Sequence, residues 1–352
     1  MRRKKIFFLL LIFSFLITWT GCSKTPEVRD GSEPTAQTAF LMGTIVKITI
    51  FDDIADENIF PEVFARVQEI EDKMTINKDT DKSEIIKLNA LAGQEFVTLS
   101  PDTFFVLAKG KDYSVLSQGK FDITIGPLVK LWDIGTEEAR VPADITIQEK
   151  LPLINYNNLH LNKDSRQAKL QEKGMIVDLG AIAKGYAADE AARILRKKGI
   201  EHGIINLGGN ILVLNTKPDG SSWRLGLQDP ETPRGDYMGI VKLDNQALVS
   251  SGTYERYLEQ DGKRYHHIID PRTGYPAANN LNSVSIITKN STDADALSTT
   301  IFLLGLEKGM ELIETLPDTE AIFITTEKKV FVSSGIDRDI FQIVKDEYKL
   351  QK

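Results

Sequence analysis

The chain has 352 residues, of which 41% are hydrophobic and 26% charged, so it is long enough for one large domain or two intimately packed subdomains. Its net charge of -7 argues against a broad basic surface for nucleic acid. The single cysteine excludes an internal disulfide and a thiolate zinc site, so any metal ion should have mainly oxygen ligands.

The amino terminus has the pattern of an export signal. A cationic start, "MRRKK", precedes an apolar run over residues 6–19, which is short for a membrane-spanning helix. "TWTGC" then resembles a bacterial lipoprotein processing site, which predicts a signal peptide over 1–21 and lipidation of Cys22. An uncleaved anchor is the alternative. The polar residues 22–37 read as a flexible tether. Either way the protein should be exported, on the outer face of the cytoplasmic membrane or facing the periplasm.

The body of the chain, residues 38–345, begins with clear periodic patterns. The β-branched run Thr44–Phe51 predicts a strand, and apolar residues at helical spacing predict a helix over 59–76. A second helix should start with Ser100 as N-cap and Pro101 at the first position, and end at Gly119. The stretch 135–166 is polar and irregular.

In the second half of the body, predicted strands and helices follow one another without regular order. An apolar strand from residue 175 and a helix come first, followed by short strands between residues 203 and 288. A helix from about Thr292 and a strand pair near 320–333 come next, and residues 346–352 form a polar tail. Because regular βαβ alternation is missing, the sequence predicts an α+β fold of mixed sheets with packed helices.

The stretch "MIVDLGAIAKGYAAD", residues 175–189, predicts a turn that leads into a helix just after Gly180. The first turn of a helix presents free N–H groups and a positive dipole, which suit a phosphate. Lys184 adds a full charge one turn in. Asp178 could cap the helix, bind a ligand N–H or attract a metal. A packing turn with a capping aspartate is the simpler alternative.

The stretch "HHIIDPRTGYP", residues 266–276, joins two histidines to a tight turn. The histidines end a predicted strand, so alternation sends His266 and His267 to opposite faces and only one can face a site. A histidine near its ordinary pKa can act as a general base for a hydroxyl. A structural role is the alternative.

The stretch "NSTDADALSTTIFLLG", residues 290–305, predicts a helix with Asp295 and Thr299 one turn apart. A carboxylate and a hydroxyl on one face suit Mg²⁺, which prefers oxygen ligands. Asp293 points elsewhere. The alternative is that the acids complement the helix dipole, with Ser291 or Thr292 as cap. A phosphate turn, a magnesium pair and a base together suit phosphoryl or nucleotidyl transfer.

Seven motifs in this order resemble the ApbE family, over roughly residues 38–345. They are "MGT" at 42–44, "FDITIGPL" at 121–128, "DLGAIAKGYAAD" at 178–189, "NLGGNI" at 206–211, "SSGTYERY" at 250–257, "HHIIDPRTGYP" and "DADALSTTIFLLG". The resemblance implies a magnesium-dependent FAD:protein FMN transferase. Such an enzyme moves FMN from FAD to a Ser or Thr hydroxyl of a partner and releases AMP. The partner would be a subunit or domain of an exported membrane redox complex.

The resemblance also implies roles for individual residues. Residues of the flavin and nucleotide site would be Met42, Gly119, Lys120, Phe121, Asp122, Asp178, Lys184 and Ile269, with Ile269 against the adenine. Mg²⁺ would be held by the backbone carbonyl of Ala181 and the side chains of Asp295 and Thr299. His267 would be the base for the acceptor hydroxyl, and Asp270 and Arg272 would support its loop.

Two other functions remain open from the sequence. A FAD pyrophosphatase would use the same site with water in place of the acceptor, and would release FMN and AMP. A lipoprotein that only stores or presents flavin would bind FAD without turnover; the retained histidine and Asp/Thr pair argue against it.

Overall fold

The computed structural model describes residues 33–53, 58–77 and 80–351. The predicted signal peptide, Cys22 and most of the predicted tether lie outside these residues. Within the described ranges, none of the helices combines the length and the apolar character needed to cross a bilayer.

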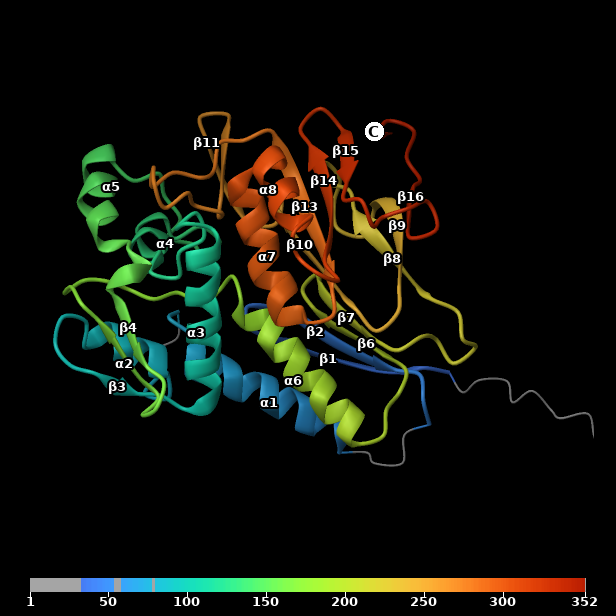
Figure 1. Ribbon diagram of the computed structural model, residues 1–352, viewed down its shortest axis with the longest axis horizontal. Helices are drawn as coiled ribbons and strands as arrows, with labels where there is room; N and C mark the ends of the chain where they lie inside the picture. The colour runs from blue at the N-terminus through green and yellow to red at the C-terminus, as the bar shows by residue number, and fades with distance from the viewer. Residues whose placement is uncertain (1–32, 54–57, 78–79, 352) are drawn as a thin grey trace, which may run out of the picture. The chain divides into compact units, whose positions relative to one another are not determined.

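A nine-stranded sheet runs through the centre of the fold (Figure 1). Every neighbouring pair in it is antiparallel except β15 and β17, which are parallel. In spatial order the strands are β1 (Thr35–Leu41), β2 (Thr44–Ile50), β6 (Gly203–Leu207), β7 (Asn210–Leu214), β10 (Ala247–Gly252), β13 (Leu281–Thr288), β14 (Glu320–Thr325), β15 (Lys329–Val332) and β17 (Lys349–Leu350).

Helices cover one face of this sheet and a smaller sheet packs on the other. The helices are α1 (Ile59–Met74), α6 (Ala183–Lys197), α7 (Ser291–Leu304) and α8 (Leu306–Ile313), and the smaller sheet has β8 (Trp223–Gln228), β9 (Tyr237–Leu243) and β16 (Phe341–Ile343). Strand alternation separates two cores: Val249 of β10 joins the core under the helices, and its neighbour Leu248 joins the core under the smaller sheet. Figure 1 shows α6 and α7 lying against the sheet on its helical side.

A second group of elements stands beside the α6 and α7 layer (Figure 1). It comprises α2 (Glu84–Ala90), α3 (Pro101–Leu116), α4 (Gly126–Trp132), α5 (Asp144–Lys150), two 3₁₀ turns (Leu151–Leu153 and Tyr156–Asn158) and a sheet of β3 (Val97–Thr98), β5 (Gln167–Leu170) and β4 (Leu159–Asn162). A hairpin of β11 (Tyr257–Gln260) and β12 (Lys263–His266) pairs only with itself. The described residues all belong to one compact unit.

The periodic segments are where the sequence placed them. The predicted strand Thr44–Phe51 is β2, the predicted helix 59–76 is α1, and the strand pair near 320–333 is β14 and β15. The α+β prediction is confirmed. The second predicted helix has Ser100 as its N-cap, but it ends at Leu116 instead of Gly119. The chain turns back there, with the N–H of Gly119 donating to the carbonyl of Ser114.

Four expectations from the sequence differ from the structure. Thr35–Gln37, predicted as tether, belong to β1 and pair with β2. The predicted tail 346–352 includes β17, and the buried Tyr348 donates its hydroxyl to Asp229 at 2.6 Å. The irregular stretch 135–166 contains α5 and part of the small β3–β5–β4 sheet. The predicted strand at 175 is only an isolated bridge at Ile176, because the next residues turn toward α6.

Candidate active site

The amino end of α6 meets the first turns of α7, where the carboxylate of Asp295 is buried. Its Oδ2 accepts the backbone N–H of Gly185 at 2.9 Å, and Oδ1 lies 3.3 Å from Nζ of Lys184. The helix begins at Ala183, slightly later than predicted, so the N–H of Gly185 belongs to its first turn and has no partner within the helix. Asp295 therefore caps α6 from the neighbouring helix, and only 3% of its surface is exposed.

Asp189 of α6 makes the reverse connection. Its two carboxylate oxygens accept the N–H groups of Ser291 and Thr292 at 2.8 and 2.9 Å, and Oδ2 also accepts the hydroxyl of Thr292. The sequence suggested Ser291 or Thr292 as the cap of this helix. The N-cap position is Asn290, which makes no capping side-chain bond, so the cap comes from α6.

Gly185 allows the two helices to approach this closely. A Cβ at this position would lie 2.2 Å from the carbonyl oxygen of Ser291, so a larger residue would push α7 away. At Gly185 the close neighbour is another helix.

Two of the predicted metal ligands, Asp295 and Thr299, lie one turn apart on α7. The hydroxyl of Thr299 lies 3.2 Å from that of Ser251 on β10, and Ser251 also lies 2.8 Å from Ser298. The ammonium of Lys184 lies 3.3 Å from Asp295 Oδ1 and 3.4 Å from the carbonyl oxygen of Gly180, the residue before Ala181. A cation thus already lies between a carboxylate and a carbonyl of this turn. Hard oxygen donors of this kind fit Mg²⁺.

The described residues contain no cluster of three His, Cys, Asp or Glu side chains suited to a metal. A site made from one carboxylate, one hydroxyl and one backbone carbonyl has no such cluster. Asp293 lies apart from it, as expected, and is held by the hydroxyl of Tyr113 at 2.5 Å and by Lys109 at 2.8 Å.

Asp178 lies at the mouth of the turn before α6. Its Oδ1 accepts the N–H of Gly180 at 2.6 Å, so it stabilises the turn and does not cap the helix itself. Burial raises the pKa of this carboxyl, and the charges of Lys130, Arg256 and Lys184 oppose that rise. Three cations therefore surround the entrance to the turn, which favours an anionic ligand.

His267 and Arg256 are joined through the main chain. The carbonyl oxygen of Arg256 accepts the backbone N–H of His267 at 3.1 Å and lies 3.1 Å from Nδ1 of the same residue. A carbonyl only accepts, so Nδ1 carries the proton and Nε2 keeps its lone pair. Burial, followed by the charge of Arg256, lowers the pKa of His267 to about 3. The imidazole is therefore neutral at physiological pH.

His266 has a different environment, as the alternation predicted. It is buried, its Nε2 lies 3.1 Å from the carbonyl oxygen of Ala277, and its ring packs edge-on against Phe302. Burial lowers its pKa as well. His266 is a structural residue of the core, and His267 is the histidine near the charged site.

The Asp-Pro-Arg-Thr-Gly turn is attached to the segment at 117–120. Asp270 forms an ion pair with Lys120 at 2.6 Å, and Arg272 donates to the carbonyl of Gln118 at 3.2 Å. Ile269 is 6% exposed and belongs to a small core with Trp132 and Ile147. The charge of Lys120 is therefore paired with Asp270 of this loop. Ile269 has little exposed surface that an adenine could contact.

The predicted flavin-lining segment 119–122 is mostly structural. Phe121 is 3% exposed and packs edge-on with Tyr113. The carboxylate of Asp122 accepts the N–H and hydroxyl of Thr124 and the N–H of Tyr156. Both side chains hold this turn in place.

Met42 and Gly43 form the two-residue turn between β1 and β2. Their φ angles are 53° and 67°, the pattern of a type I′ turn. A left-handed conformation costs energy for methionine, so this turn fits a functional constraint. The Cβ position of Gly43 lies 3.6 Å from a guanidinium nitrogen of Arg256, which places the turn beside the His267 segment.

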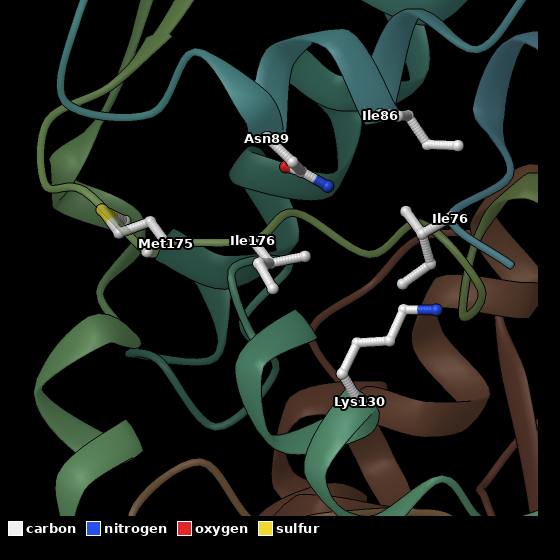
Figure 2. A pocket seen from close by; sticks show the side chains of 7 residues that line it. Ile76, Ile86, Asn89, Lys130, Met175 and Ile176 are labelled. Carbon is white, nitrogen blue, oxygen red and sulfur yellow. The ribbon is translucent and has the colours of Figure 1, made fainter. Parts of the chain in front are cut away.

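A cavity of about 300 Å³ lies beside the segment that leads to Asp178 and is lined in part by Met175 and Ile176. Ile76, Ile86 and Ile176 line this cavity, and Figure 2 shows the ammonium of Lys130 below Ile76. Lys130 donates to Asn77 at 2.7 Å. The side-chain amide of Asn89 donates through Nδ2 to the carbonyl of Val177 and accepts the N–H of Val177 at Oδ1. These two bonds fix the segment that leads to Asp178.

Sequence reasoning missed three residues of this region. Arg256 and Lys130 bring positive charge to Asp178; Arg256 stands in the "SSGTYERY" motif, but nothing in that motif alone places its charge at this site. Asn210 is 4% exposed, and its Nδ2 has no hydrogen-bond partner among the described residues. The "NLGGNI" motif contained it, but a single asparagine carries no chemical signal until its burial is known.

Comparison with known proteins gives one consistent result. The model of the ApbE family matches residues 42–323. An FAD:protein FMN transferase of Klebsiella pneumoniae (strain 342) is 39% identical over 84% of this chain and 90% of its own length. One from Treponema pallidum (strain Nichols) is 34% identical over 90% of each chain.

Solved structures agree with the sequence relatives. The crystal structure of the ApbE protein from Thermotoga maritima MSB8 has a TM-score of 0.76 and 30% identity, over 83% of this chain and 94% of that one. The flavin transferase ApbE from Vibrio cholerae has the same TM-score and identity, over 86% of this chain and 97% of that one.

Proposed function

The chain belongs to the ApbE family, and we propose that it is an FAD:protein FMN transferase that attaches FMN to a Ser or Thr hydroxyl of an acceptor protein and releases AMP. The observation that carries this proposal is the neutral His267, held in one tautomer beside a cationic site. A base next to a phosphate site is what hydroxyl attack on phosphorus requires.

The reaction exchanges the phosphoanhydride bond of FAD for a phosphoester bond to the acceptor. The acceptor oxygen forms a bond to the phosphorus of the FMN half of FAD. The bond between that phosphorus and the bridging oxygen breaks, and AMP leaves with the bridging oxygen and its electron pair. The hydroxyl proton passes to Nε2 of His267, whose Nδ1 is already protonated toward the carbonyl of Arg256. The imidazolium then returns this proton to solvent.

The residues at the start of α6 would position the pyrophosphate. Lys184 supplies charge in the first turn of the helix, and the turn at 178–181 brings its backbone close to the ligand. Asp178 keeps the turn closed through Gly180, because its Oδ1 accepts that N–H. Positioning of this kind supplies most of the rate enhancement in phosphoryl transfer.

Asp295, Thr299 and the carbonyl of Ala181 would hold Mg²⁺. The position of the Lys184 ammonium between Asp295 and Gly180 supports a cation site at this corner. When bound, Mg²⁺ would neutralise charge on the pyrophosphate. The ammonium of Lys184 would then leave Asp295 and become available to the phosphates.

The cellular setting is part of the proposal. The amino-terminal pattern supports export and lipid anchoring through Cys22, which lies outside the described residues. An acceptor in an exported membrane redox complex fits that location. With a net charge of -7, the protein gains little attraction from anionic lipid, so the anchor would come from lipidation.

The test is to incubate the purified protein with FAD, Mg²⁺ and a candidate exported acceptor, and to measure the intact mass of the acceptor. A gain of one FMN, lost when the acceptor hydroxyl is replaced by alanine, supports transfer. FMN and AMP without acceptor modification would indicate hydrolysis. Unchanged FAD in the presence of a flavinylatable acceptor would contradict both activities.

A further inference from the structure

Arg256 follows β10 on the loop that leads into β11, and its backbone is tied to the proposed base. Its carbonyl oxygen accepts the N–H of His267 and the Nδ1–H of the same residue, both at 3.1 Å. Two bonds to one carbonyl fix the start of the Arg256 side chain relative to the imidazole. A guanidinium and a base are therefore presented together.

Two glycine turns define the path of the Arg256 side chain. A Cβ on Gly135 would lie 3.1 Å from Cδ of Arg256, so the aliphatic stem crosses this turn. A Cβ on Gly43 would lie 3.6 Å from Nη2, so the guanidinium reaches the turn between β1 and β2. The side chain is thus laid over two backbone segments that are far apart in sequence.

The other cations of the site are already engaged. Lys184 contacts Asp295 and Gly180, Lys120 pairs with Asp270, and Lys130 donates to Asn77. Arg256 is exposed, and within the described part of the chain its guanidinium makes no hydrogen bond or ion pair. Its five donors remain available to a ligand.

The charge of Arg256 acts on both sides of the proposed reaction centre. It favours the ionised form of Asp178 at the phosphate turn and disfavours the charged form of His267. The charge of Lys184 acts on both groups as well, so both cations lie near the turn before α6 and the proposed base. The phosphate that is attacked would have to occupy this region.

We propose that Arg256 is a substrate-binding residue whose guanidinium hydrogen-bonds the pyrophosphate of FAD beside His267. This inference rests on the proposed function. A guanidinium can donate two parallel hydrogen bonds to phosphate oxygens and stays charged at any relevant pH. It would orient the attacked phosphorus and offset the negative charge that develops on the leaving AMP.

The test compares Arg256→Gln and Arg256→Lys with Arg264→Gln as the matched control. Arg264 is an exposed arginine of β12 in the adjoining hairpin, where it lies over the ring of Tyr257, 4.1 Å from its centroid. Flavin fluorescence gives the Kd of FAD and of riboflavin, which lacks phosphate. Displacement of FAD by ADP reports on the pyrophosphate without the flavin ring.

For Arg256→Gln we expect a Kd for FAD and for ADP that is roughly 10- to 100-fold weaker, the range for a charge-assisted contact, with riboflavin binding unchanged. Arg256→Lys should recover part of the affinity, since it restores charge without the two-pronged donor. Arg264→Gln should match the unsubstituted protein.

Unchanged FAD and ADP affinities in Arg256→Gln would overturn the inference, as would equal weakening of riboflavin and FAD. In both cases FMN transfer by the unsubstituted protein would leave the proposed function intact. If that protein fails to bind FAD or to modify an acceptor, the proposed function itself is wrong.

Discussion

Asp189 and Asp295 cap each other's helices. Asp189 of α6 accepts the first N–H groups of α7, and Asp295 of α7 accepts the N–H of Gly185 in the first turn of α6. Each helix therefore needs the other to satisfy its amino end. Asp295 is also the carboxylate of the proposed metal site, so the geometry of that site depends on how the two helices pack.

Asp189→Ala should lower the free energy of unfolding by about 1–3 kcal/mol, because it removes a cap and leaves the N–H groups of two buried residues without a partner. Ser291 is fully buried and Thr292 is 4% exposed, so water cannot replace the carboxylate easily. Urea unfolding measures the change. Asp164→Ala, at an exposed turn, is the control and should leave the midpoint where it is.

Gly185→Ala should destabilise the protein by about 1–3 kcal/mol through overpacking, although alanine is the better helix former. The added Cβ would stand 2.2 Å from the carbonyl oxygen of Ser291. Thermal unfolding would reveal the loss as a lower Tm. An equal or higher Tm would mean that α7 moves aside without cost, which the reciprocal caps argue against.

Lys184→Met should tighten Mg²⁺ binding and weaken FAD binding. The ammonium lies 3.3 Å from Asp295 Oδ1, so a metal ion must compete with it for that oxygen. The side chain of Asp295 is 5% exposed and that of Lys184 24%, so the pair is only partly screened; we expect about 1 kcal/mol, several-fold in the Kd of Mg²⁺.

Isothermal titration with Mg²⁺, in the absence of FAD, measures the first effect of Lys184→Met. Lys197→Met, at an exposed position in the last turn of the same helix, removes the same charge away from the site and is the control. A weaker Mg²⁺ affinity in Lys184→Met than in the control would show that the ammonium does not occupy the metal position.

The pH profile of kcat/KM for FMN transfer should show no loss of activity on the acid side near pH 6.5, the ordinary pKa of histidine. The pKa of His267 is lowered to about 3, so the imidazole stays unprotonated as the pH falls from 8 to 5, and protonation removes the base only below that range. The check is kcat/KM for FAD across pH 5–8. An inflection near 6.5 that disappears in His267→Ala would contradict the assignment.

The same titration links His267 to its neighbour. Loss of the Arg256 charge stabilises the imidazolium, so Arg256→Gln should move any acid limb to higher pH.

His267→Ala should keep the Kd of FAD and lower the transfer rate by roughly 10²–10⁴-fold, the usual contribution of a general base. A His267→Ala protein that labels its acceptor at the normal rate would rule out this base.

The local sequence pattern was enough to predict the helices and strands that bury one face. The apolar spacing of α1 and the β-branched run of β2 predicted these elements, because periodicity reports burial directly. The pairing of Asp295 with Thr299 on one face of α7 also followed from helical spacing. The resemblance to the ApbE family, and not the spacing, gave His267 and Ala181 their roles.

The sequence could not predict partners that lie far apart along the chain. Nothing local distinguishes Asp189 from other helical acids, yet it caps a helix about a hundred residues later. Phe121 and Asp122 stand in the motif at 121–128, but their side chains contact Tyr113, Thr124 and Tyr156. Arg256 became visible only when the turns at Gly43 and Gly135 were placed against it.

The way β2 and β6 meet has a kinetic consequence. Val46 pairs with Leu207, so the turn at Met42 reaches its place only after about 160 residues of chain have closed on themselves. Such long-range pairings form slowly. An intermediate without them lacks a complete pocket, so in refolding experiments FAD binding should return in one late phase, after most of the helical signal has recovered.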